Sequence, residues 1–252
     1  MCGIIAVLQR RPTGSAPDLG HVLAELARLG AQPADDRAAL HALAAELEAL
    51  DASLRGPLGV VALLSEPDGV DRVAAATAPF DARIRAFELR LEEHADELEA
   101  ANAALLRLKD VVWAIGHDRV DTARGVDDLL GGAEGQPLSV LCGYWAIEVA
   151  LTAIDRLEVR GRDSAGLNIL VSHHELGDDL VGDRATDPLF TSMAVRQSGG
   201  VMSFVYKVAN EIGELGDNTS ALRAGIRSDE LLRLALEEGG AEATVLGHTR
   251  WA

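Results

Sequence analysis

The sequence predicts an α+β fold, with strands near both ends of the chain and a long helical region between them. Residues 3–8 form a short apolar run that is typical of a buried strand. Over residues 19–115, apolar residues often recur at alternating spacings of three and four, as amphipathic helices require. Apolar runs return at 167–172, 201–208 and 245–247, where we expect further strands.

Two short helices are expected in the first part of the helical region, where leucines repeat over residues 19–29 and 40–54. A Gly-Ala-Gln-Pro sequence at residues 30–33 separates them. Residues 59–65 could form a strand, because this apolar stretch lies between Gly-Pro and Pro-Asp-Gly turn signals.

The clearest periodicity begins after Pro79. Apolar residues occupy the first and fourth positions of successive heptads, with His94 as the only exception. The seam consists of Ile84, Phe87, Leu91, His94, Leu98, Ala101, Leu105, Leu108, Val112 and Ile115. Such a helix can pack on the two shorter helices in a hairpin or bundle, or pair with a second copy in a homodimer; we favour packing within the chain.

The last part of the chain mixes helices with strands. An apolar helix is expected from about Leu138 to Leu157, after a glycine-rich break. Ser228 can cap a helix that runs to about Glu238 and ends at Gly239.

Composition excludes several classes of partner. The chain has 252 residues and a net charge of −17, which repels phosphate backbones and anionic membrane surfaces over about a Debye length. We therefore expect neither nucleic acid nor a membrane as a partner. The two cysteines, Cys2 and Cys142, lack the spacing of a zinc site, and His173 and His174 would point to opposite faces of a strand. A reduced, cytoplasmic protein without metal or cofactor is predicted.

Neither export nor membrane insertion is predicted. The apolar start is too short for a signal peptide, and its two arginines follow the apolar run instead of preceding it. The longest apolar segment, 138–154, contains Glu148 and is shorter than the roughly 20 residues that a membrane span needs.

The start of the chain can supply a nucleophile. Removal of Met1 would leave Cys2 with a thiol and a free α-amine on one carbon. Their reference pKa values are about 8.5 and about 7.7–8.0, so the amine can take the thiol proton at little cost near neutral pH. The alternative is that a cysteine before a buried strand serves only in packing.

Two polar loops can add to such a site. Residues 160–166 are dense in polar groups between glycines, and residues 247–251 place an arginine and a tryptophan just after a predicted strand. An arginine fork can bind a carboxylate bidentately, at about 1.5–3 kcal/mol for each charge-assisted bond, which suits an amino-acid substrate. A surface salt bridge is the commoner role of a single arginine.

Three separated stretches are specific when they are taken together. They are Met1-Cys2-Gly3-Ile4-Ile5, Leu157 to Leu167 with the sequence Leu-Glu-Val-Arg-Gly-Arg-Asp-Ser-Ala-Gly-Leu, and Gly247-His248-Thr249-Arg250-Trp251-Ala252. This combination resembles the glutaminase domain of class-II, N-terminal-nucleophile glutamine amidotransferases. The Asp-Ser-Ala-Gly and Thr-Arg-Trp sequences favour the branch of glutamine:fructose-6-phosphate amidotransferases, or glucosamine-6-phosphate synthases.

The resemblance implies a mechanism and a fold. Cys2 would attack the side-chain amide carbon of glutamine with its own α-amine as base, and ammonia would leave a glutamyl thioester that water hydrolyses. Arg250 would hold the glutamine α-carboxylate, and Trp251 would close the site and shelter ammonia. The residues that would support this geometry are Arg160, Asp163 and Thr249. The implied fold is an αββα sandwich, and the implied acceptor is a sugar phosphate in domains that this sequence lacks.

The sequence departs from the family in two places besides its C-terminal part. About 130 residues separate the first strand from the helix that normally follows it, so residues 1–10 and 144–252 would form the glutaminase domain and 11–143 a helical insertion. Arg162 replaces a residue that is usually tyrosine in this branch. Both departures leave the fold intact but weaken the assignment of an acceptor.

The family's oxyanion donors come from an Asn-Gly pair, and the sequence contains no Asn-Gly dipeptide. Loss of one oxyanion donor typically costs about 2.7–4 kcal/mol in the barrier. We therefore expect this chain to be an N-terminal fragment of a longer enzyme, with little or no activity alone.

Two other functions remain open. In the first, the heptad helices mediate assembly and the amidotransferase-like part binds glutamine without catalysis, or binds nothing. In the second, the same glutaminase serves a different acceptor. No nucleotide-binding glycine loop occurs in the sequence.

Overall fold

The computed structural model describes residues 3–33, 36–92, 98–159, 161, 163–177, 194–209 and 214–250. The chain divides into two compact units, which we call the sheet unit (Met1–Thr13 and Gly125–Ala252) and the helical unit (Gly14–Arg124). These boundaries differ from the expected insertion at 11–143, because residues 125–143 group with the sheet. Arg227, for example, forms an ion pair with Asp128 at 2.8 Å.

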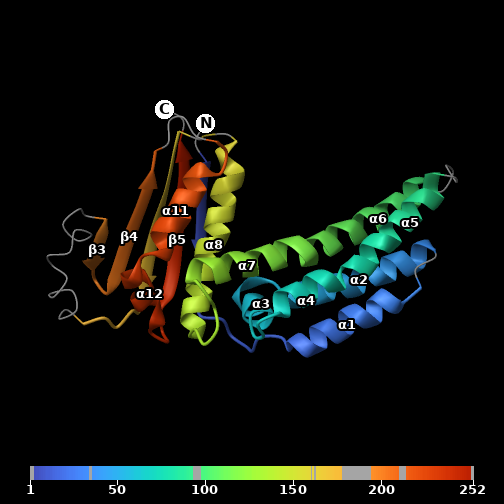
Figure 1. The fold of residues 1–252 in the computed structure, drawn as a ribbon, viewed down its shortest axis with the longest axis horizontal. Coiled ribbons are helices and arrows are strands. Elements are labelled where there is room, and N and C mark those ends of the chain that lie inside the picture. Colours follow the sequence, from blue (N-terminus) through green and yellow to red (C-terminus); the bar gives the residue numbers. More distant parts are fainter. Residues whose placement is uncertain are drawn as a thin grey trace. The chain divides into compact units, whose positions relative to one another are not determined.

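The sheet unit contains a five-stranded antiparallel sheet with the order β1-β5-β2-β4-β3 (Figure 1). Its strands are β1 (Gly3–Leu8), β2 (Ser164–Ser172), β3 (Val195–Ser198), β4 (Val201–Val208) and β5 (Glu242–Arg250). The first and last strands of the chain are therefore neighbours. This arrangement shows an α+β fold, and the described residues form one sheet where the αββα expectation has two.

Helices cover one face of this sheet. They are α8 (Leu138–Glu158), α11 (Asp217–Arg227) and α12 (Glu230–Glu237). Residues of β5 alternate between this buried face and the opposite face, which we call the open face. On the open face, Ile4 is 79% exposed, Leu8 is 66% exposed and Leu246 is 41% exposed. The sheet therefore has one packed side and one side with large apolar residues in contact with solvent.

Helix α8 is the central helix of the sheet unit. It is long and apolar enough to cross a membrane by length and composition alone, but most of it is buried inside the unit. Ile154 lies against Gly247 of β5, where a Cβ on the glycine would come within 2.9 Å of Cδ1 of the isoleucine. This burial is what the core helix of a soluble protein shows.

The helical unit consists of short helices with leucine-rich contact faces. Its elements are α1 (Leu19–Ala31), α2 (Arg37–Ser53), α3 (Gly56–Leu63), α4 (Gly69–Ala76), α5 (Ala78–Glu92), α6 (Leu98–Trp113) and a π-helical turn, η2 (Ala114–Arg119). Helix α7 (Val120–Leu130) contains the boundary to the sheet unit. The side chains of Asp18 and Asp36 cap α1 and α2 by accepting backbone N–H groups, as expected for N-cap residues.

The long heptad helix is present as two helices, α5 and α6, that contact each other (Figure 1). The seam positions Ile84 and Phe87 of α5 and Leu105 and Leu108 of α6 are buried, and so is Ile115 of η2. His94 lies outside the described residues. Packing within the chain is thus confirmed for these positions, while the prediction of one continuous helix is wrong, since the same period suits a helical hairpin.

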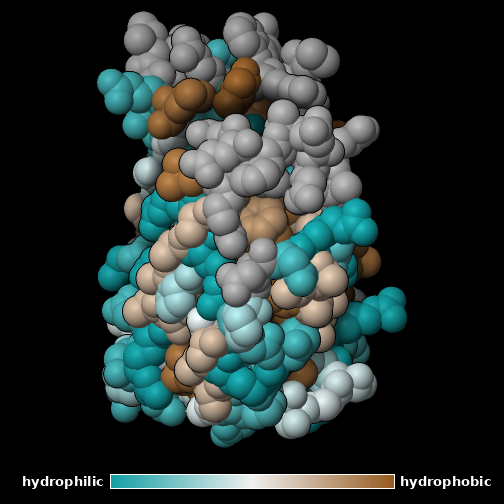
Figure 2. Space-filling model, turned by 90° about the vertical axis from the view of Figure 1, so that its right-hand side faces the viewer, coloured by the Kyte–Doolittle hydropathy of each residue, from teal (hydrophilic) through white to brown (hydrophobic). Residues whose placement is uncertain are grey.

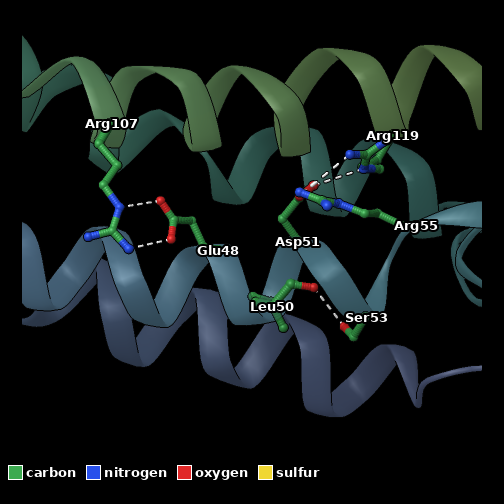
Figure 3. Close-up of polar contacts among 7 residues, drawn as sticks. All are labelled: Glu48, Leu50, Asp51, Ser53, Arg55, Arg107 and Arg119. Carbon is green, nitrogen blue, oxygen red and sulfur yellow. Dashed lines mark hydrogen bonds and ion pairs between the residues drawn. The ribbon is translucent and has the colours of Figure 1, made fainter.

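A buried carboxylate joins three parts of the helical unit. Asp51 of α2 is 1% exposed and accepts hydrogen bonds from Arg55 Nη2 at 2.7 Å and from Arg119 Nε at 2.8 Å (Figure 3). One turn away, Glu48 pairs with Arg107 of α6, but both side chains are more than a third exposed. Asp51 therefore fixes η2 against α2, and Glu48 adds a surface contact.

The surface in Figure 2 carries hydrophilic residues with apolar ones scattered among them. Trp113, at the end of α6, is one exposed apolar residue, with 59% of its surface accessible. Its ring stacks on the imidazole of His117 with a centroid separation of 3.7 Å. His117 lies in η2, four residues after Trp113.

Residues 56–63 form a helix, so the prediction of a strand at 59–65 is wrong. Pro57 stands in the first turn of α3, where proline favours a helix start. Gly59, Val60 and Leu63 are buried. Periodicity alone cannot separate a short buried helix from a buried strand, and none of the strands that the structure describes pairs with the segment.

Other element boundaries shift in ways that matter for the site. β1 and β4 have the expected limits, but β2 begins three residues early, at Ser164, and β5 extends through Arg250. Asp229, and not Ser228, caps α12 by accepting from the N–H groups of Leu231 and Leu232. Strand β3 and helix α11 were not predicted.

Candidate functional site

The three stretches that carry the resemblance meet at one end of the sheet. β1 begins there at Gly3, β2 begins there at Ser164, and β5 ends there at Arg250. In the register, Thr249 is the partner of both Gly3 and Ala165, and Arg250 is the partner of Ser164. β5 therefore lies between the other two motifs and contacts both.

Two hydrogen bonds fix this junction. The backbone N–H of Gly3 donates to Oγ1 of Thr249 at 3.3 Å. The backbone N–H of Asp163 donates to the carbonyl oxygen of Arg250 at 3.1 Å. Thr249 and Asp163 were both expected to support the site. Thr249 contacts Gly3, the neighbour of the predicted nucleophile, and Asp163 contacts Arg250, the predicted carboxylate ligand.

Gly3 has no room for a side chain. A Cβ at this position would lie 2.9 Å from Cδ1 of Leu157 and 3.0 Å from Oγ1 of Thr249. Leu157 comes from the last turn of α8, so the helix that precedes the polar loop presses directly on the first residue of β1. The close approach explains why glycine follows Cys2 in the sequence.

Glu158 anchors the same end of α8. It is 1% exposed, and its carboxylate accepts the backbone N–H of Gly216 at 2.6 Å and the hydroxyl of Thr219 at 3.4 Å. Gly216 is the N-cap of α11 and has a φ of 95°, which glycine adopts without strain. The buried carboxylate at the helix N-terminus is favourably placed in the helix dipole. It holds α11 next to the polar loop.

Arg250 and His248 lie on the open face, where both are exposed. No hydrogen bond or ion pair of the Arg250 guanidinium occurs among the described residues. His248 lies opposite Ile4 and Gly166, and a Cβ on Gly166 would come within 2.7 Å of the imidazole Cε1. The missing side chain at Gly166 leaves the space that the imidazole fills, beside the start of β1.

Three expected site residues, Cys2, Arg160 and Trp251, lie outside the described residues. Their described neighbours are Gly3, Gly161 and Arg250, and all three belong to the same end of the sheet. Gly161 is buried, and its N–H donates to the carbonyl oxygen of Glu158 at 3.1 Å.

Leu157, Glu158 and His248 lie within the three motifs, but the sequence alone predicted no role for them. Their roles depend on contacts with residues far away in the sequence. One signal was available for Glu158: an acidic residue at the end of a long apolar helix needs a partner if it is buried. For Leu157, only the packing of α8 on β1 defines the contact, and for His248 only the pairing of the strands does.

The second cysteine is a poor nucleophile. Cys142 of α8 is 1% exposed, and burial raises the pKa of its thiol to about 11. It lines a small pocket of about 140 Å³ together with Gln9 and Leu138. That pocket lies toward the opposite end of the sheet, where β1 ends and Gln9 pairs with Ala243.

The described residues contain no group of three or more side chains suited to hold a metal ion. His174 is 3% exposed, and its Nδ1 accepts the backbone N–H of Leu176 at 3.2 Å, so Nε2 carries the proton of the neutral ring. Among the described residues, Nε2 has no hydrogen-bond partner, and burial lowers the pKa of the imidazole. His173, beside it, is exposed and has a φ of 57°.

Comparison of the chain with known protein families, characterised proteins and solved structures finds no match.

Proposed function

We propose that this chain carries an N-terminal-nucleophile glutaminase site, of the class that uses the thiol and α-amine of a terminal cysteine. Within that class, we assign it to the glutamine amidotransferases that deliver ammonia to a sugar phosphate. The observation that carries the proposal is the meeting of three motifs, far apart in the sequence, at one end of one sheet. The finer fold implied is the αββα sandwich of N-terminal-nucleophile hydrolases.

The position of Gly3 supports the role of Cys2. A nucleophile that is also the chain terminus must be held by the strand that follows it, because no preceding residue restrains it. Gly3 is paired with Thr249 and packed against Leu157. Once Met1 is removed, Cys2 is the terminal residue and is bonded directly to this fixed point.

The proposed reaction uses only the thiol and α-amine of Cys2, the glutamine side chain and water. The Cys2 α-amine takes the thiol proton, the sulfur attacks the glutamine amide carbon, and the amine returns the proton to the leaving nitrogen, so that ammonia departs. Water then attacks the thioester carbon, which gives glutamate and the free thiol. Arg250 supports binding of the glutamine α-carboxylate, because its guanidinium is exposed at the same end of the sheet.

The proposed partners follow from this reaction. Glutamine is the donor, and Trp251 would shelter ammonia on its way to a sugar-phosphate acceptor, with fructose 6-phosphate as the first candidate. We propose a cytoplasmic location, where cysteine stays reduced.

The test is covalent labelling of the chain without Met1 by 6-diazo-5-oxo-L-norleucine, an electrophile that mimics glutamine. We expect it to modify Cys2 and leave Cys142 unmodified, as read by peptide mass spectrometry. Cys2→Ala should abolish labelling. Arg250→Met should raise the concentration of reagent needed for half-maximal rate, with little change in labelling by iodoacetamide, which has no carboxylate to bind.

One result contradicts the proposal: a Cys2 that reacts with the glutamine mimic no faster than Cys142. The assembly function would then replace catalysis. The acceptor needs a separate assay, in which protein isolated from its source receives glutamine and fructose 6-phosphate. Glucosamine 6-phosphate as product supports the assignment, and glutamate without it points to another acceptor.

A further inference from the structure

We propose that the buried hydroxyl of Thr249 is a positioning group that sets the place of the Cys2 nucleophile through the backbone of Gly3. This inference rests on the proposed glutaminase function. It assigns to Thr249 a specific act, acceptance of the Gly3 N–H, which an alanine or valine at this position cannot perform.

The first support is the burial of the hydroxyl. Thr249 has no exposed surface, and Oγ1 lies 3.3 Å from the Gly3 nitrogen. Water cannot easily replace an acceptor at such a position, so loss of Oγ1 leaves the N–H of Gly3 without its partner. Threonine is also β-branched and has few χ1 rotamers, which keeps the hydroxyl in place.

The second support is the packing on Gly3 from α8. Leu157 and Thr249 both come within about 3 Å of the position that a Cβ of Gly3 would occupy. Gly3 is thus confined by a leucine from the helix and tied by a hydroxyl from β5. The hydrogen bond fixes the direction of the backbone at Gly3, and the packing leaves no space for a different direction.

The third support is the role of β5 itself. The strand that carries Thr249 also carries Arg250, the proposed ligand for the glutamine carboxylate. One dipeptide therefore fixes the first described residue of β1 and presents the carboxylate ligand. A displacement of about 1 Å between nucleophile and bound substrate can reduce a rate by two orders of magnitude. The Gly3–Thr249 bond sets this separation.

The experiment compares Thr249→Val with Thr249→Ser. Valine keeps the shape of threonine without the hydroxyl, and serine keeps the hydroxyl. Thr244→Val is the matched control, because Thr244 is on the same strand and is paired with Leu8, away from Gly3. Each variant, without Met1, is labelled with 6-diazo-5-oxo-L-norleucine over a range of concentrations and pH, and with iodoacetamide.

For Thr249→Val we expect the maximal rate of Cys2 labelling by the glutamine mimic to fall about 3- to 10-fold, as loss of one hydrogen bond implies. The concentration for half-maximal rate should stay the same, since Arg250 is intact. Labelling by iodoacetamide should not fall, because that reagent needs no positioned substrate. Thr249→Ser should restore most of the rate, and Thr244→Val should match the wild type.

A purely structural role of Thr249 predicts a different pattern. Loosening of the sheet unit would expose Cys142 to iodoacetamide and raise its labelling. If Thr249→Val does not fold, hydrogen exchange of the Gly3 amide in the wild-type chain replaces the variant. Protection of that amide supports the hydrogen bond from Gly3 to the Thr249 hydroxyl. Exchange at the rate of an unstructured peptide overturns it.

Failure of this inference is distinct from failure of the proposed function. If wild-type Cys2 does not react with the glutamine mimic, the glutaminase proposal is wrong. A reactive wild-type Cys2 with equal maximal rates in the wild type and Thr249→Val leaves that proposal intact and removes the role of the hydroxyl. Equal losses in Thr249→Ser and Thr249→Val would also remove it, because the methyl group would then matter instead.

Discussion

The backbone N–H of Asp163 donates to the carbonyl oxygen of Arg250 at 3.1 Å, so the loop after α8 and the end of β5 are held together by main-chain atoms. A main-chain bond does not depend on the identity of either side chain. The backbone therefore keeps the two segments adjacent whatever side chains they carry.

Glu158 should be important for the stability of the sheet unit. Glu158→Ala leaves the N–H of Gly216 and the hydroxyl of Thr219 without their acceptor. We expect the free energy of unfolding to fall by about 1–3 kcal/mol, as measured by urea unfolding. Glu237→Ala is the control, because Glu237 is an exposed glutamate of α12, and surface changes cost less than about 0.5 kcal/mol. Equal effects of the two changes would contradict the anchoring role.

The ion pair between Glu148 and Arg223 should behave as a buried pair. Glu148 has a side chain only 4% exposed and accepts two hydrogen bonds from the arginine, at 2.6 and 2.7 Å. Arg223→Met should destabilise the unit by about 3–5 kcal/mol, because a carboxylate then stays buried without its partner. The double variant with Glu148→Leu should recover much of that loss.

A matched surface pair provides the control for that prediction. Arg227 and Asp128 are more than half exposed, so Arg227→Met should cost less than about 1 kcal/mol. Thermal unfolding of the three variants measures the difference. A loss of similar size for Arg223→Met and Arg227→Met would show that burial of Glu148 is not decisive.

In the helical unit, Asp51 should matter far more than its neighbour Glu48. Asp51→Ala removes the acceptor of Arg55 and Arg119 and should cost about 1–3 kcal/mol, less than a fully buried pair because the arginines are partly exposed. Glu48→Ala should cost less than about 1 kcal/mol. Thermal unfolding at low and at high salt tests both, since salt should weaken the Glu48 contribution and leave most of the Asp51 contribution.

His174 should make the sheet unit sensitive to acid. Burial lowers the pKa of its imidazole, whereas the unfolded chain binds this proton near its reference pKa of about 6.5. Below that pH, the unfolded state binds more protons than the folded state, so stability should fall as the pH drops from about 6.5 towards the folded-state pKa. Below the folded-state pKa of His174, its effect on stability no longer changes with pH.

His174→Asn should remove this part of the pH dependence, because asparagine can still accept the N–H of Leu176 and does not titrate. His173→Asn is the control, since His173 is exposed and asparagine tolerates its positive φ. Urea unfolding at pH 5 and pH 7.5 measures the slope. An unchanged slope in His174→Asn would assign the acid sensitivity to other groups.

Much of the local structure could be predicted because it depends on neighbours in the sequence. β1, β4 and α8 have the expected positions, since each is an apolar run of a length that suits one type of element. The seam positions Leu105, Leu108 and Ile115 are buried as the heptads predicted. The candidate site residues were found through motifs, and Asp163, Thr249 and Arg250 do lie at one end of the sheet.

Other features depended on competition between distant segments. The periodicity of residues 59–65 suits a helix as well as a strand. None of the described strands pairs with them, and the segment is helical. The heptad region has one period but folds back as α5 and α6, which a period cannot reveal. The limits of β2 and β5 exceeded the prediction because polar residues such as Ser164 and His248 pair across the sheet.

The sequence by itself determined where helices and strands could form and which residues could supply a nucleophile and a carboxylate ligand. Only the tertiary structure decided that Gly3 meets Thr249 and Leu157, and that Glu158 holds Gly216. The physical reason is that periodicity and propensity act over a few residues. Strand register and the partner of a buried polar group depend on which distant segments give the lowest free energy together.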